Sequence, residues 1–224
     1  MFDSNGEFRT GAGWTHTRLA LLLSLAAGYV DAYAFLKYSV YSSFMSGNTT
    51  QTGLQFGQAK FARAALDLLP IPSFALGVFG GILLVGRQRL RFGVVGALLV
   101  ASAASAGFSA TQSPLNIALL SLAMGLMNTL ITRVGAQTVH LGFVTGTLYS
   151  LSEHLALAVA RAPDPHILGI WDTHRWRAAR LAWIWMAFLF GALLGTTATS
   201  FLDVWTPVLP ASVLVAATFG SNGK

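Results

Sequence analysis

The chain has 224 residues, of which 54% are hydrophobic and only 10% are charged. A soluble domain has roughly a quarter of its residues charged, so this composition excludes an ordinary soluble protein and indicates a membrane protein. The absence of cysteine excludes disulfides, thiol catalysis and cysteine-ligated metals. The net charge of +6 comes from basic residues clustered between apolar runs, as the positive-inside rule describes, so no nucleic-acid partner is expected.

Six apolar runs approach the length of about 20 residues that a helix needs to cross a bilayer. In chain order they are Leu19–Leu36, Leu68–Val85, Phe92–Ala110, Leu115–Ile131, Leu181–Thr197 and Val204–Phe219, the last one short and interrupted by Pro207 and Pro210. The sequence therefore predicts an all-α, polytopic membrane bundle of about six transmembrane helices. One transmembrane domain covers residues 18–219, between tails at 1–17 and 220–224.

Two polar or mixed segments follow the first and fourth runs. Their central parts, residues 45–60 and 139–160, are compatible with re-entrant, interfacial or fully spanning structure. Because they contain most of the polar motifs, we expect the functional residues there.

The distribution of basic residues predicts the orientation. Arg87, Arg89 and Arg91 lie between the second and third runs, and Arg133, Arg161, Arg175, Arg177 and Arg180 lie between the fourth and fifth. The positive-inside rule places both segments in the cytoplasm, and six spans then put both termini there as well. Lys37, Lys60 and Arg63 would lie outside.

The two halves of the chain share a pattern of motifs. The run Gly28–Ala32 resembles Gly125–Thr129, and Phe44–Asn48 resembles Phe143–Thr147, with a spacing of sixteen residues in the first copy and eighteen in the second. The second run also contains Gly77 and Gly81, and the fifth contains Gly191 and Gly195. Small residues four positions apart let helix backbones approach closely, so these four glycines are predicted to pack helices.

This pattern predicts a unit of three spans used twice, at about residues 19–110 and 115–219. An odd number of crossings makes the second copy enter the membrane from the opposite side. Such inverted repeats are typical of transporters, in which the substrate site lies near the midplane between the repeats.

Asp31 is the only carboxylate within the six apolar runs. A charged group there costs roughly 2.5–3.5 kcal/mol on insertion scales, so it should face protein or water. It is either a protonatable or cation-binding group, or a buried acceptor for amides and hydroxyls. Asn128 occupies the equivalent position in the second half, as an amide partner in a coupling site or as a second structural hydrogen-bonding group.

Hydroxyl residues and glycine precede a helix-compatible stretch in each half, at Ser46, Gly47 and Asn48 and again at Thr145 and Gly146. Such side chains accept hydrogen bonds from free amides at a helix start, and the helix N-terminus attracts anions. If these segments enter the membrane, two half-helix ends would face each other from opposite sides. The alternative is two ordinary helix caps at the interface.

With these motifs, the sequence resembles the YoaK family of bacterial inner-membrane proteins over about Leu19–Phe219. The residues that carry the resemblance are Gly28, Asp31, Ala32, Met45, Ser46, Gly47, Asn48, Gly125, Asn128, Thr145 and Gly146. Ser46 and Thr129 differ from the residues usual in that family, and so does the segment His140–Gly142. The resemblance implies a bacterial inner-membrane location and implies no particular activity or substrate.

We interpret the chain as a small-solute transporter or channel, not an enzyme, with no cofactor and no metal. Its expected partners are the lipid bilayer, a small solute or ion, and a second copy in a homodimer. The expected midplane site comprises Asp31, Ser46, Gly47, Asn48, Asn128, Thr145 and Gly146. The alternative is a non-transporting scaffold or regulatory protein in which the same motifs serve only to pack helices.

Overall fold

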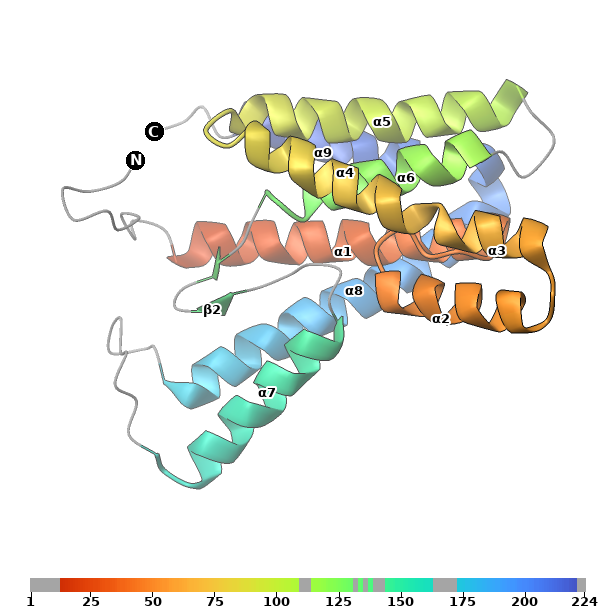
Figure 1. Cartoon of the computed structure of the whole chain (residues 1–224). Helices are drawn as coiled ribbons and strands as arrows, with labels where there is room; N and C mark the ends of the chain where they lie inside the picture. The colour runs from red at the N-terminus through yellow and green to blue at the C-terminus, as the bar shows by residue number, and fades with distance from the viewer. Residues whose placement is uncertain are drawn as a thin grey trace.

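A computed structural model of the chain describes residues 13–108, 114–130, 133–134, 137–138, 144–162 and 173–220 (Figure 1). Apart from a hairpin of two short antiparallel strands, β1 (Arg133–Val134) and β2 (Gln137–Thr138), the regular structure in these ranges is helical. The helices are α1 (Gly13–Tyr38), α2 (Met45–Gly57), α3 (Phe61–Leu68), α4 (Pro70–Leu83), α5 (Gln88–Phe108), α6 (Pro114–Met127), α7 (Val144–Val159), α8 (His174–Leu202), the 3-10 turn η1 (Asp203–Trp205) and α9 (Val208–Gly220).

The predicted helical membrane bundle is confirmed. Within the described ranges, four segments are long and apolar enough to cross a membrane: Thr17–Tyr38, Phe61–Leu83, Gln88–Gly107 and His174–Trp205. The fourth and sixth apolar runs form the shorter helices α6 and α9, of 14 and 13 residues. At 1.5 Å per residue each is about 20 Å long, which is less than the roughly 30 Å of a bilayer core.

Two of the predicted boundaries were wrong. Helical structure leading into the second run begins at Phe61, because α3 continues into α4 with a break only at Leu69. Pro70 lacks an amide hydrogen and therefore starts α4 without losing a hydrogen bond. The fifth run lies within the 29-residue helix α8, so Arg175, Arg177 and Arg180 belong to its first turns rather than to a loop.

The prolines of the sixth run begin a helix instead of interrupting one. The chain leaves α8 through the η1 turn, Pro207 directly precedes α9, and Pro210 lies in the first turn of α9. Amides in a first turn have no partner within the helix, so proline is tolerated there.

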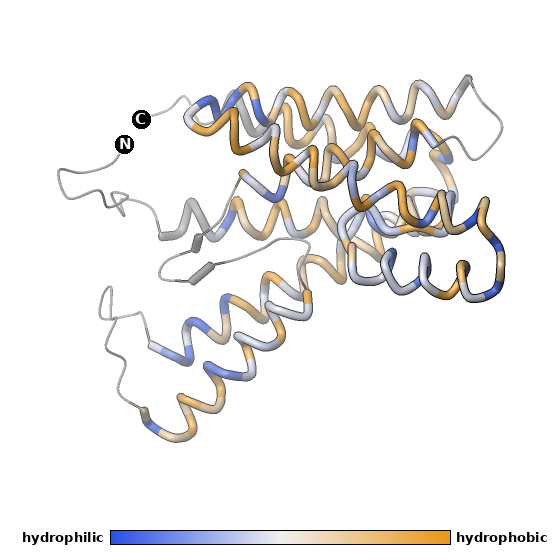
Figure 2. Tube along the Cα trace, viewed as in Figure 1, coloured by the Kyte–Doolittle hydropathy of each residue, from blue (hydrophilic) through white to orange (hydrophobic). Residues whose placement is uncertain are grey.

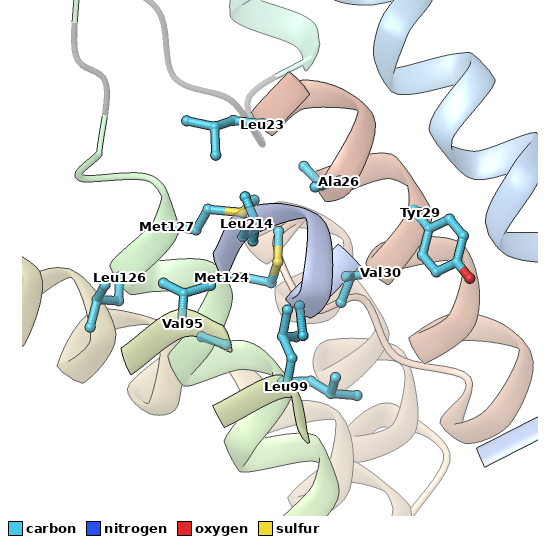
Figure 3. Packing of buried hydrophobic residues seen from close by; sticks show 14 of the residues in the cluster. Leu23, Ala26, Tyr29, Val30, Val95, Leu99, Met124, Leu126, Met127 and Leu214 are labelled. Atoms are coloured by element: carbon cyan, nitrogen blue, oxygen red, sulfur yellow. The ribbon is translucent and has the colours of Figure 1, made fainter. Parts of the chain in front are cut away.

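Apolar side chains from α1, α5, α6 and α9 meet in the interior (Figure 3). The cluster includes Leu23, Ala26, Val30, Val95, Leu99, Met124, Met127 and Leu214. Large apolar side chains also cover the outside, for example Leu76 and Phe79 on α4 and Trp183 and Leu193 on α8. Hydrophobic residues, in orange, run along most of the helices (Figure 2). This outer surface contacts the lipid bilayer. Because lipid is as apolar as the core, close packing rather than transfer from water holds the helices together.

Candidate functional site

The chain turns back toward the middle of the molecule after α1. Helix α1 ends at Tyr38, and Ser39 adopts a left-handed conformation with φ of 56°. Residues 39–44 then return along α1, and α2 begins at Met45 and runs outward again beside α3 (Figure 1). The start of α2 therefore lies deeper in the bundle than the end of α1.

Asp31 fixes this return. Its Oδ1 accepts hydrogen bonds from the amides of Ser42 and Ser43, both at 2.8 Å, and from the Ser42 hydroxyl at 2.6 Å. Its Oδ2 accepts a hydrogen bond from the Ser43 hydroxyl at 2.5 Å. Asp31 lies seven residues before the end of α1, so these bonds carry the chain about 10 Å back along the helix. The geometry matches the interpretation of Asp31 as a buried acceptor for amides and hydroxyls.

Asn48 makes a second connection within the same turn. Its Oδ1 accepts a hydrogen bond from the Tyr41 amide at 2.9 Å, and its Nδ2 donates to the Tyr41 carbonyl at 2.7 Å. The buried side-chain amide of Asn48 thus makes both hydrogen bonds to the Tyr41 backbone that a neighbouring β-strand would make. Gly47 lies against the rings of Phe44 and Tyr41, where a Cβ would overlap the Phe44 ring. Together these contacts hold the first turn of α2 against residues 41–44.

The expected capping role of the first motif was wrong. The N-cap residue of α2 is Phe44, and it makes no side-chain capping hydrogen bond. Asn48 is occupied by Tyr41, and Ser46 is exposed on the first turn. The motif therefore shapes the turn before α2 and leaves the Ser46 hydroxyl on the surface.

The residues of the second half lie on different elements. Asn128 directly follows α6, and its Nδ2 donates to the Met124 carbonyl at 3.0 Å. Thr145 is exposed and Gly146 half-buried in the first turn of α7. In Figure 1, α2 and α7 both begin near the middle of the molecule and run toward opposite ends. The structure thus gathers Asp31, Gly47 and Asn48 around one turn, and places the second-half residues at the end of α6 and the start of α7.

Helices α1 and α8 pack through a reciprocal pair of glycines. A Cβ at Gly28 would overlap the carbonyl oxygen of Phe188, and a Cβ at Gly191 would overlap that of Leu25. Each glycine therefore lies on the carbonyl three residues before the other glycine. Backbone meets backbone at this point, which leaves no room for a side chain.

Helices α4 and α6 pack in the same way. A Cβ at Gly77 would overlap the carbonyl oxygen of Leu122, and a Cβ at Gly125 would overlap that of Phe74. The three-residue offset is identical to that between α1 and α8. The helix that opens each half thus packs against a long helix of the other half through equivalent glycines, α1 against α8 and α6 against α4.

The glycine four residues later on α4 and on α8 also lies close to the neighbouring helix. Gly195 lies against the backbone of Tyr29, and Gly81 lies against the side chain of Thr129. Arg91 donates from Nη1 to the carbonyl of Thr129 at 2.8 Å, which holds the end of α6 against α5. The sequence analysis used Arg91 only to predict orientation and missed this contact, and it missed the pair Ser42 and Ser43. The adjacent hydroxyls in a polar turn were the available signal for the serines.

Two histidines that are twenty residues apart in the sequence meet between α7 and α8. The Nδ1 atoms of His154 and His174 lie 3.1 Å apart. The part of the chain that the structure describes holds no group of three or more His, Asp or Glu side chains suited to a metal ion. His140 and His166 lie outside the described residues.

Comparisons with known proteins agree with this architecture. Residues 19–220 match the family described as "Protein of unknown function (DUF1275)". The chain is 31% identical over 205 residues to the UPF0700 transmembrane protein RA0705 of Rhizobium meliloti (strain 1021), covering 90% of this chain and 85% of that one. It is 28% identical over 158 residues to the UPF0700 transmembrane protein YoaK of Bacillus subtilis (strain 168), covering 66% and 70%. No solved structure matches the chain. The chain belongs to the DUF1275 family of transmembrane proteins, the YoaK family that its paired glycine motifs indicate.

Proposed function

We propose that this protein is a small-solute transporter or channel built from two inverted three-helix repeats. The observation that carries the proposal is the return of residues 39–44 beside Asp31, which brings the start of α2 back along α1 and away from the end of that helix. Non-helical backbone at membrane depth is tolerated only where it is buried in protein or lines a water-filled cavity. Broken helices of this kind form the binding sites of many transporters.

The relation between the two halves supports the repeats. The reciprocal glycine contacts of α1 with α8 and of α4 with α6 have the same spacing. In Figure 1, α1 and α6 run in opposite directions, and so do α4 and α8, and α5 and α9. Such reversal is what inversion across the membrane plane produces, and alternating access by rocking one repeat against the other would follow from it.

A non-transporting scaffold is the second candidate. It is favoured by the hydrogen bonding of Asp31, because four donors from Ser42 and Ser43 already occupy its two oxygens. In a scaffold the same bonds would only stabilise a turn. The two functions differ in whether water and solute reach the start of α2.

We also propose that both termini face the cytoplasm of a bacterial cell. The start of α1, the turn between α4 and α5, the start of α8 and the end of α9 lie at one end of the bundle (left in Figure 1). Described basic residues at these element ends, together with β1 and the end of α7, are Arg18, Arg87, Arg89, Arg91, Arg133, Arg161, Arg175, Arg177 and Arg180. The three at the other end are Lys37, Lys60 and Arg63, of which Lys37 pairs with Asp203 and Arg63 with Asp67. The excess of arginine favours the cytoplasm for the first group.

Single cysteines test this orientation, because the chain has none of its own. Lys60, directly before α3, and Gln88, the first residue of α5, are both exposed, and the starts of these two helices lie at opposite ends of the bundle in Figure 1. We expect a membrane-impermeant maleimide to label the Lys60→Cys protein on intact cells, and to label Gln88→Cys only after the membrane is opened. The reverse pattern would invert the orientation.

Transport itself is tested by blocking the start of α2. The Ser46→Cys protein, reconstituted in liposomes, should take up at least one labelled compound from a panel of amino acids, sugars, carboxylates and inorganic ions. Alkylation of the introduced thiol with a bulky maleimide should abolish that uptake, because Ser46 is exposed at the proposed opening. The matched control is Lys60→Cys, whose alkylation at the α2–α3 turn should leave uptake unchanged.

Two outcomes would contradict the transport proposal. Uptake equal to that of protein-free liposomes for the whole panel would favour the scaffold. Uptake that persists after alkylation of the Ser46→Cys protein would remove the start of α2 from the pathway.

A further inference from the structure

Asp67 differs from the other acidic residues in the described part of the chain. Asp31 accepts four hydrogen bonds, Asp203 is exposed and pairs with Lys37, and Glu153 is exposed. The side chain of Asp67 is fully buried in α3. Its Oδ2 has no hydrogen-bond partner, and its Oδ1 has only an ion pair with Arg63, at 2.8 Å from Nη2. A buried carboxylate with one oxygen left without a partner is costly to keep charged.

Arg63 links this carboxylate to the end of α1. The same Nη2 atom donates to the carbonyls of Tyr38 and Ser39, both at 2.9 Å. One guanidinium nitrogen carries two hydrogens, so it cannot fully satisfy three acceptors at once. A single guanidinium nitrogen of Arg63 therefore joins the carboxylate of Asp67 to the last carbonyls of α1.

The helices that pack against α3 offer no compensating charge for Asp67 among the described residues. Neither α2 nor α4 contains a titratable residue. Among described ionisable groups, Arg63 faces Asp67 directly, Lys60 stands at the start of α3, and Lys37 is paired with Asp203.

We propose that Asp67 is a proton-binding site whose protonation releases Arg63 from the end of α1. A proton from the solution adds to Oδ2 and gives a neutral carboxylic acid. The ion pair is lost, and the charge of Arg63 is then left uncompensated in a site where a quarter of its side chain is exposed. Hydration draws the guanidinium outward, and the carbonyls of Tyr38 and Ser39 lose their donor.

In a transporter, the proton that binds at Asp67 would be the coupling ion. The end of α1 leads directly into the returning segment 39–44, so the charge of Asp67 controls the tie between that segment and the α2–α3 hairpin. This coupling role rests on the proposed transport function. Proton binding and the release of Arg63 do not, and they can be measured without any solute.

Infrared difference spectroscopy of the full-length protein in lipid nanodiscs tests the site. Lowering the pH should produce C=O stretching bands of protonated carboxylic acids, and Asp67→Asn should lack one band of the parent protein, the Asp67 band. Asp67→Glu keeps the acid and should restore a band, which separates loss of the group from loss of the fold. The matched controls Asp31→Asn and Asp203→Asn should both retain the Asp67 band.

A nitroxide on Ser39→Cys reports the end of α1 in the same samples. The mobility of the nitroxide should rise as the pH falls, with the same midpoint as the Asp67 infrared band. Asp67→Asn should abolish this dependence on pH. If folded Asp67→Asn keeps every carboxylic acid band of the parent protein, the proton site is overturned. If the mobility of the nitroxide does not change with pH, the release of Arg63 is overturned. A protein that transports nothing but shows both signals would refute transport alone.

Discussion

Replacing Gly77 with alanine is expected to destabilise the folded bundle, while the same replacement at Gly80, about one turn later on α4, is expected to be harmless. A methyl group at Gly77 would overlap the carbonyl oxygen of Leu122, whereas one at Gly80 would meet no described atom within 4 Å. The backbone of α6 cannot rotate away as a side chain could, so α4 and α6 must separate. Overpacking of this kind costs about 1–3 kcal/mol.

The measurement is unfolding in mixed micelles, followed by circular dichroism as the denaturing detergent is increased. Gly80→Ala serves as the control for helix propensity, because alanine in a helix is favoured over glycine by about 0.5–1 kcal/mol. Gly191→Ala should behave like Gly77→Ala, since it lies against the carbonyl of Leu25 in the equivalent contact. Equal stability of Gly77→Ala and Gly80→Ala would show that the close contact of the two backbones is not needed.

Replacing Asp31 with alanine is expected to detach the turn before α2 and to lower stability substantially. The variant leaves the buried amides of Ser42 and Ser43 without an acceptor. Each unsatisfied buried group costs about 1–3 kcal/mol, so the expected loss in free energy of unfolding is about 2–6 kcal/mol. Hydrogen exchange at residues 42–43 should accelerate in the same protein.

Two variants serve as controls for the stability of Asp31→Ala. Asp203→Ala removes an exposed carboxylate with an ion pair to Lys37 and should cost at most about 1 kcal/mol. Asp31→Asn keeps an oxygen acceptor for both amides, and the Ser43 hydroxyl can turn to accept from the new amide, so its loss should be clearly smaller than that of Asp31→Ala. Wild-type stability in Asp31→Ala would refute the anchoring role. Lost solute uptake in folded Asp31→Asn would assign the charge itself to transport.

The sequence was informative about helices and their pairing. Apolar runs of sufficient length predicted the bundle because lipid imposes this pattern on any spanning helix. Gly77 and Gly191 could be recognised because only small residues allow two backbones to approach. The helix that each would meet could not be recognised, since spacing within one helix carries no information about its partner.

The details of the turn after α1 were less predictable. Asp31 could be identified as a residue in need of partners, because a carboxylate in a membrane helix requires them. Ser42 and Ser43 could not be assigned as those partners, since the chain must first reverse direction over 39–44. Likewise, Ser46 and Asn48 have the composition of a helix cap, but Asn48 instead pairs with Tyr41 across that reversal. Local propensity was overridden by a contact that exists only in the folded turn.

The short helix α9 has a consequence for the surrounding membrane. Its 13 residues cover about 20 Å, and its outer face presents the exposed apolar side chains Leu209 and Val213. A neighbouring bilayer of ordinary thickness would have its acyl chains extend beyond this face. Hydrophobic mismatch therefore requires the lipid beside α9 to thin, so the protein should favour lipids with short acyl chains.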